Sequence, residues 1–154
     1  PTDILIFNRQ GGSTTLYGAD LSVESWITDA LRLRGFISLV SDDSIPKVNR
    51  FTDYLLNGPT TKGAVEVHYT HEPSGLSLGV QVRAVSSFPV VSGVYQGTVD
   101  RYQVVDAHVR YRLPWAQDLF LDLAGYNLFD NRHVEFLGAP EIGRMVVTRL
   151  TATF

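Results

Sequence analysis

The stretch "YQVVDAHVRYRL", residues 102–113, decides the fold class of this chain. Its apolar and polar residues alternate with a period of two. This period separates them onto opposite faces of a β-strand, whereas a helix would scatter the charges around its circumference. One face would carry Val105, Ala107, Val109, Tyr111 and Leu113, and the other Asp106, His108, Arg110 and Arg112. The stretch therefore predicts a strand with one apolar and one charged face.

The same alternation recurs along the chain. It is found in residues 16–27, 31–39, 65–69, 76–84, 119–125 and 144–154, and more weakly in "DILIF" at residues 3–7. Together these segments predict about eight strands. The charged faces would carry Asp20, Glu24, Arg32, Arg34, Glu66, His68, Arg83, Asp106, His108, Arg110, Arg112, Asp122 and Arg149. We therefore expect an all-β fold.

The connections between these strands alternate in length. Short turns lie near Asp29, at "EPSG" and at "PWAQD", and long connections span roughly 41–62, 86–101 and 130–143. In consecutive hairpins every second connection lies at the same end of the sheet. The pattern predicts an antiparallel up-and-down meander with tight turns at one end and long loops at the other.

Three features favour a transmembrane barrel, whose apolar face meets lipid, over a soluble barrel, whose apolar face is buried. The strands are long, about 9–13 residues, which suits a tilted crossing of a bilayer. The loop asymmetry is typical of outer-membrane barrels. Aromatic residues gather toward both strand ends, as membrane interfaces favour. They are Tyr69, Tyr111, Trp115 and Phe154 at the turn end, and Tyr17, Phe88, Tyr102 and Phe129 at the other.

The final segment, "DLFLDLAGYNLFDNRHVEFLGAPEIGRMVVTRLTATF", resembles the C-terminal end of TonB-dependent outer-membrane receptors. The matching features are the "NLFD" turn, the "LGAPEIGR" loop and a last strand ending on an aromatic residue. The motif residues are Asn127, Leu128, Phe129, Asp130, Gly143 and Arg144. The upstream "TTLYGADLSVESWITDALRLRGFISLVSDD" also resembles a strand, turn and strand of that family.

The resemblance implies a function for residues 1–154. They would form the C-terminal portion of a barrel of about 22 strands, without the plug domain of such receptors. The whole receptor would sit in the bacterial outer membrane and take up an iron chelate (siderophore) or another scarce nutrient, driven by TonB acting through the missing plug. Its partners would be outer-membrane lipid, the ligand and the barrel-assembly machinery. The resemblance implies that this machinery reads the final strand, with Leu150, Ala152 and the terminal Phe154.

Other functions find less support in the sequence. The net charge of −3 predicts no nucleic-acid partner, and the absence of cysteine excludes disulfides and thiolate metal sites within the chain. Asp106, His108, Arg110 and Asp122 could suggest acid–base chemistry, but alternating charges on a lumen face more often form an ion-pair network, so we expect no enzyme activity. His68 and His108 fall on non-adjacent strands, which argues against a metal site, and no cofactor is predicted.

Two alternatives stay open at this point. One is a stand-alone eight-stranded outer-membrane barrel with an adhesive, structural or lipid-modifying role; the other, less favoured, is a soluble ligand-binding barrel. The long row of charged residues argues against a narrow closed lumen, because unpaired buried charge is costly. We therefore expect an open wall segment with edges near Ile4 and Val147. The long loops offer Tyr95, Arg101, Arg132, His133 and Glu135 either as ligand contacts or as ordinary solvated residues.

Overall fold

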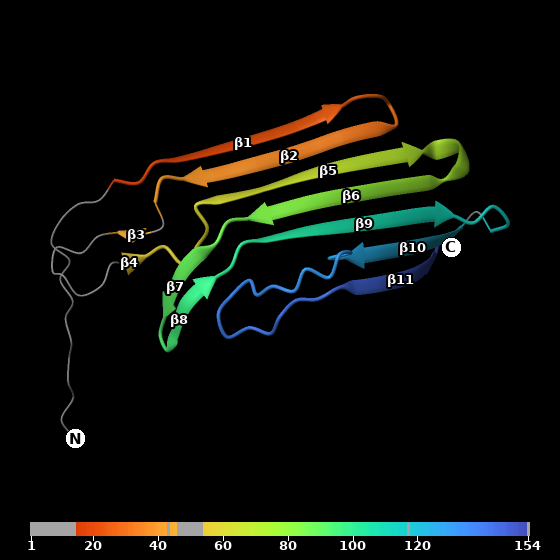
Figure 1. Ribbon diagram of the computed structural model, residues 1–154. Coiled ribbons are helices and arrows are strands. Elements are labelled where there is room, and N and C mark those ends of the chain that lie inside the picture. The colour runs from red at the N-terminus through yellow and green to blue at the C-terminus, as the bar shows by residue number, and fades with distance from the viewer. Residues whose placement is uncertain (1–14, 43, 46–53, 117, 154) are drawn as a thin grey trace, which may run out of the picture.

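A computed structural model describes residues 15–42, 44–45, 54–116 and 118–153, and the alternating segments among them form strands (Figure 1). The long strands are β1 (Gly18–Trp26), β2 (Leu31–Val40), β5 (Thr61–His71), β6 (Leu76–Val85), β9 (Tyr102–Arg112), β10 (Leu119–Tyr126) and β11 (Met145–Ala152). They pair antiparallel in the order β1-β2-β5-β6-β9-β10-β11 within one seven-stranded sheet. The predicted all-β meander is confirmed.

Two short ribbons lie in two of the three long connections, and the sequence pattern did not predict them. The pair β3 (Ser44–Ile45) and β4 (Tyr54–Leu55) lies between β2 and β5, and the pair β7 (Phe88–Ser92) and β8 (Tyr95–Val99) lies between β6 and β9. At the opposite end, the short η1 turn (Glu72–Ser74) joins β5 to β6. The two ends of the sheet therefore differ as expected, with tight turns at one and elaborated loops at the other (Figure 1).

The strand register aligns the alternating residues of all seven strands. Leu33 lies opposite Val67, which lies opposite Val80, while Arg34 lies opposite Glu66, which lies opposite Gln81. Residues directly opposite each other in an antiparallel pair project from the same face. The sheet therefore has one apolar face and one polar face, and every charged residue in the row predicted above falls on the polar face.

The apolar face of the described sheet is largely exposed. Val65 is 52% exposed, Val80 47% and Leu123 45%, while the polar face ranges from the partly buried Glu66 and Asp122 to the exposed Arg34. A water-soluble barrel buries its apolar rows and exposes its charges, so this arrangement is inverted for a protein surrounded by water. The described valines are therefore not packed in a dry interior, as a soluble barrel would require.

The only cluster of buried apolar residues in the described part of the chain lies at the loop end, not along the sheet. It consists of Phe88, Val90, Val99, Tyr102 and Val104, with Val85 and Leu137 packed against it. The β7–β8 ribbon folds over the start of β9 and so buries these side chains. The expectation that Phe88 and Tyr102 belong to an aromatic band at a membrane interface is therefore wrong.

The sheet does not close on itself within the described residues. Its outer strands β1 and β11 each pair on one side only, so the described sheet is an open wall with two free edges. The expected edge near Val147 lies on β11. The short segment at residues 3–7, with Ile4, lies outside the described residues. Among those described, no helix is both long and apolar enough to cross a membrane.

Candidate functional site

The "NLFD" turn follows β10 and begins with a buried asparagine. Asn127 and Asp130 both have positive φ angles, 51° and 52°, in the left-handed region that Asn and Asp tolerate better than other side chains. The backbone N–H of Asn127 donates to Oδ1 of Asp106 at 2.8 Å, and the N–H of Leu128 donates to the carbonyl of Val105 at 2.8 Å. The chain therefore turns sharply against β9 at this motif.

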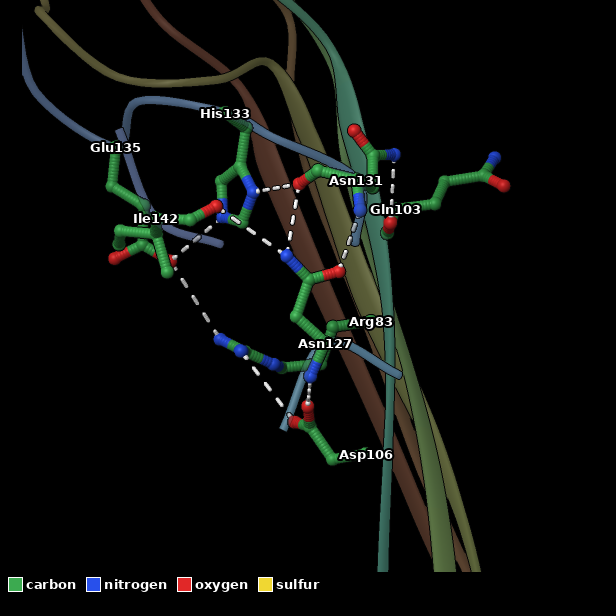
Figure 2. A network of polar contacts seen from close by, with 8 residues as sticks. All are labelled: Arg83, Gln103, Asp106, Asn127, Asn131, His133, Glu135 and Ile142. Carbon is green, nitrogen blue, oxygen red and sulfur yellow. Dashed lines mark hydrogen bonds and ion pairs between the residues drawn. The ribbon is translucent and has the colours of Figure 1, made fainter. Parts of the chain in front are cut away.

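The Asn127 side chain, 3% exposed, ties the turn to the rest of the loop (Figure 2). Its Oδ1 accepts from the backbone N–H of Asn131 at 2.9 Å. Its Nδ2 donates to the carbonyls of Asn131 and Ile142 at 3.0 and 3.4 Å. Asn131 then donates from Nδ2 to the carbonyl of Gln103 on β9 at 2.9 Å. Asn127 acts here as a turn residue whose polar atoms are occupied, as the sequence suggested.

The other motif residues meet at the second half of the turn. Oδ1 of Asp130 accepts from the backbone N–H of Arg144 at 2.8 Å, and this hydrogen bond lowers the pKa of the Asp130 carboxyl, helped by the nearby Arg132 guanidinium. Gly143 lies close by, since a Cβ there would come within 3.1 Å of the same Oδ1. Phe129 points away and is 79% exposed. The structure thus brings Asp130, Gly143 and Arg144 together.

A chain of charged groups joins the loop to the polar face, and sequence reasoning missed it (Figure 2). Arg83 on β6 lies 3.6 Å from Asp106 on β9 and 3.9 Å from Glu135 in the loop. Nε2 of His133 lies 3.7 Å from Oε1 of Glu135, and the His133 ring stacks on Tyr102 with centroids 4.2 Å apart. The sequence placed Arg83 and Asp106 on one polar face. It did not reveal the strand register or the loop path that brings Glu135 and His133 beside them.

The five loop residues considered for ligand contact are largely used in internal contacts. His133 is buried, Oε1 of Glu135 lies 3.7 Å from its Nε2, and Nε of Arg132 lies 3.7 Å from Oδ2 of Asp130. Tyr95 packs edge-on against Phe136, with ring centroids 6.3 Å apart. These contacts tie the side chains to one another within the loop end. Arg101 is exposed and lines an open hollow of about 820 Å³ beside β5 and β6.

The residues weighed for acid–base chemistry do not form one centre. Asp106 is engaged by Arg83 and Asn127, while Arg110 and Asp122 form a separate pair with their nearest charged atoms 3.8 Å apart. Among the described residues no group of three or more His, Asp or Glu side chains could hold a metal ion. The arrangement is a network of ion pairs along a polar wall.

The residues proposed for barrel assembly lie on β11. Leu150 and Ala152 project from the apolar face, and Leu150 is 62% exposed. Phe154, the third residue of this signal, lies outside the described residues. No interaction of these side chains bears on recognition by other proteins, so the assembly signal stays a prediction.

Comparison with known proteins identifies the fold. No family model matches the chain, and no curated protein matches it. Solved structures do match. The siderophore receptor PiuA from Acinetobacter baumannii matches with a TM-score of 0.69 and 19% identity over 89% of this chain and 21% of the receptor. The ferric-catecholate import receptor Fiu from E. coli K12 matches with a TM-score of 0.69 and 21% identity over 90% of this chain and 21% of the receptor.

A third match is a mutant of the ferric enterobactin receptor PfeA from Pseudomonas aeruginosa. Its TM-score is 0.64 and its identity 18%, over 90% of this chain and 22% of the receptor. The chain thus spans about a fifth of the length of each receptor. These three proteins are receptors. Because their sequence identity to this chain is low, the matches support a conclusion about its fold only. The resemblance to TonB-dependent receptors is confirmed at the level of fold: this chain is built like a wall segment of such a receptor's β-barrel.

Proposed function

We propose that residues 1–154 form the C-terminal wall of the β-barrel of a TonB-dependent outer-membrane receptor, which takes up an iron chelate or another scarce nutrient. The single observation that carries this proposal is the inverted sheet. Val65, Val80 and Leu123 are exposed on one face, while the charged residues pair with one another on the other face. An apolar outer band around a polar interior is the arrangement that a lipid bilayer stabilises.

The open edges support a wall segment over a complete small barrel. Strands β1 and β11 each carry an unpaired edge among the described residues, and an unpaired edge is not tolerated within the hydrocarbon layer. In the proposed receptor, further strands of the same protein pair with these edges and close the barrel. The plug, which the resemblance places inside that barrel, would lie against the polar face.

The absence of cysteine allows a direct test. In the full-length receptor with any other cysteines removed, Val80→Cys and Gln81→Cys are neighbours that project from opposite faces. After reconstitution into vesicles, we expect a label at position 80 to be quenched only by a lipid-dissolved quencher, and a label at position 81 only by an aqueous one. Val82→Cys and Arg83→Cys form a second matched pair. Quenching of the label at position 80 by the aqueous reagent would overturn the proposal.

Uptake requires a separate test, because a correctly inserted barrel could serve another role. A deletion strain that lacks the receptor should lose ferric-chelate or other nutrient uptake, and the loss should be the same when TonB alone is deleted. Uptake that persists without TonB would contradict the proposed energy source while leaving the membrane topology intact.

A further inference from the structure

Two histidines meet on the polar face although one strand separates them. His68 on β5 lies opposite Gly79 on β6, which in turn lies opposite His108 on β9. The two imidazole rings lie with centroids 5.5 Å apart and planes tilted by 33°. The sequence argument that non-adjacent strands keep these histidines apart is therefore wrong.

Gly79 is the reason the rings meet. A Cβ atom built at this position would come within 2.0 Å of Cε1 of His108, so the His108 ring occupies the space that any other residue's side chain would fill. On the far side of His108, its partner on β10 is Ala124, another small residue. His108, Ala124, Glu66 and Asp106 line a shallow hollow of about 200 Å³. His108 is therefore accessible from the polar side of the wall, and His68 beside it is partly buried.

The ring separation fits a shared metal ion. With metal–nitrogen bonds of about 2.0–2.1 Å, the metal lies about 3.2 Å from each ring centroid. If one nitrogen of each ring is turned toward a metal held at that distance, rings 5.5 Å apart subtend an angle of about 120° there, close to the tetrahedral range of zinc. Imidazole is also a preferred ligand of copper(II), which first-row affinity trends place above zinc.

The surroundings orient one ring and moderate the nearest positive charge. Nε2 of His68 lies 3.0 Å from Oγ of Ser77. When Nε2 donates this hydrogen bond, the lone pair is left on Nδ1, which is the usual way an outer partner sets a ligand's tautomer. Arg32, opposite His68, has its Nη1 3.5 Å from Glu24 and its guanidinium 5.5 Å from the Trp26 ring centroid. Its charge is therefore partly compensated.

We propose that His68 and His108 form a binding site for a first-row transition-metal dication, copper(II) or zinc, on the polar wall, with water in the remaining coordination positions. The site needs both imidazoles and the glycine between them. It does not depend on which solute the whole receptor takes up, so it stands or falls separately from the proposed function.

The test uses the full-length receptor, purified in detergent without a histidine tag. Equilibrium dialysis with Zn²⁺ measures binding, and electron paramagnetic resonance with Cu²⁺ counts the imidazole nitrogens. His68→Asn and His108→Asn should each weaken Zn²⁺ binding at least about tenfold and remove one nitrogen from the copper spectrum. Ser77→Ala should weaken binding by about 10–100-fold if its hydrogen bond sets the tautomer.

Gly79→Ala gives the sharpest result, because it keeps both histidines and displaces one ring. Its Zn²⁺ binding should fall as far as that of the two histidine variants, with the strand signal in circular dichroism unchanged. His71→Asn is the matched control, since His71 is the last residue of β5, away from the pair, and its Nδ1 lies 2.7 Å from Oγ of Ser74. Parental binding by both His68→Asn and His108→Asn would overturn the site. Parental binding by a folded Gly79→Ala would refute the role of the glycine.

Discussion

Replacing Asn127 by alanine should loosen the loop between β10 and β11 by about 3 kcal/mol. Two of its side-chain hydrogen bonds have ordinary lengths of 2.9 and 3.0 Å, and the third is longer at 3.4 Å. Each of the two shorter bonds contributes about 1 kcal/mol. Alanine at the φ of 51° adds about 1 kcal/mol, because it lacks the tolerance of asparagine for this region.

Hydrogen exchange of backbone amides in the full-length receptor measures this local opening. The amides of Asn131 and Ile142, which donate to Asn127 Oδ1 and to the His133 carbonyl, report on the loop directly. A cost of about 3 kcal/mol should raise their exchange rates about 150-fold, since each 1.4 kcal/mol is a factor of ten. Exchange of amides in the middle of β6 should not change, because the opening is confined to the loop.

Two further variants separate the contributions. Asn127→Gly loses the same hydrogen bonds but has no strain at this φ, so its cost should be about 1 kcal/mol smaller than that of alanine. Phe129→Ala alters a neighbouring residue of the same turn that is 79% exposed, and it should leave exchange unchanged. The reasoning is refuted if Asn127→Ala exchanges like the parent. If Asn127→Gly and Asn127→Ala had equal effects, backbone strain would contribute nothing to the cost, and the hydrogen-bond reasoning would stand.

Three other predictions follow from the sheet and its turn. Val109→Arg places a charge on the apolar face of β9 and should cost about 2–4 kcal/mol near the bilayer midplane, measured by denaturant unfolding in lipid vesicles; no loss would place this face away from lipid. Gly63→Ala brings a Cβ within 2.8 Å of the Phe36 carbonyl oxygen and should cost about 1–3 kcal/mol in the same assay. The lowered pKa of Asp130 means that its stabilisation of the turn is complete at neutral pH and is lost as the pH falls through that pKa. Exchange at the Arg144 amide, corrected for intrinsic rates, should rise in acid, and Asp130→Asn should abolish this dependence.

The alternation of residue types predicted the strands and their faces because period two is a local property of the chain. The stretch at residues 102–113 is a single strand, and its charged residues lie on the face assigned to them. Short connections fix which strands are neighbours, so the meander also followed from the sequence.

What the sequence did not predict depends on the sideways register between strands and on the path of the loops. The approach of His68 to His108 requires Gly79 to lie opposite both, and nothing local to any of the three residues reveals this alignment. The burial of Phe88 and Tyr102 requires the β7–β8 ribbon to fold back, which strand propensity alone does not indicate. Contacts between residues far apart in the sequence depend on the register of the assembled sheet and on the path of its loops.

The β7–β8 ribbon also bears on how quickly the wall can assemble. Pairing β6 with β9 requires closing the chain over residues 86–101, and the entropy lost in closing a flexible loop grows with its length. The ribbon forms from neighbours in sequence and buries Val90 and Val99 against the start of β9. A hairpin that forms first shortens the remaining flexible path, so it brings the ends of β6 and β9 together before they pair. A variant that disrupts this ribbon should therefore lose stability mainly through slower folding and little through faster unfolding.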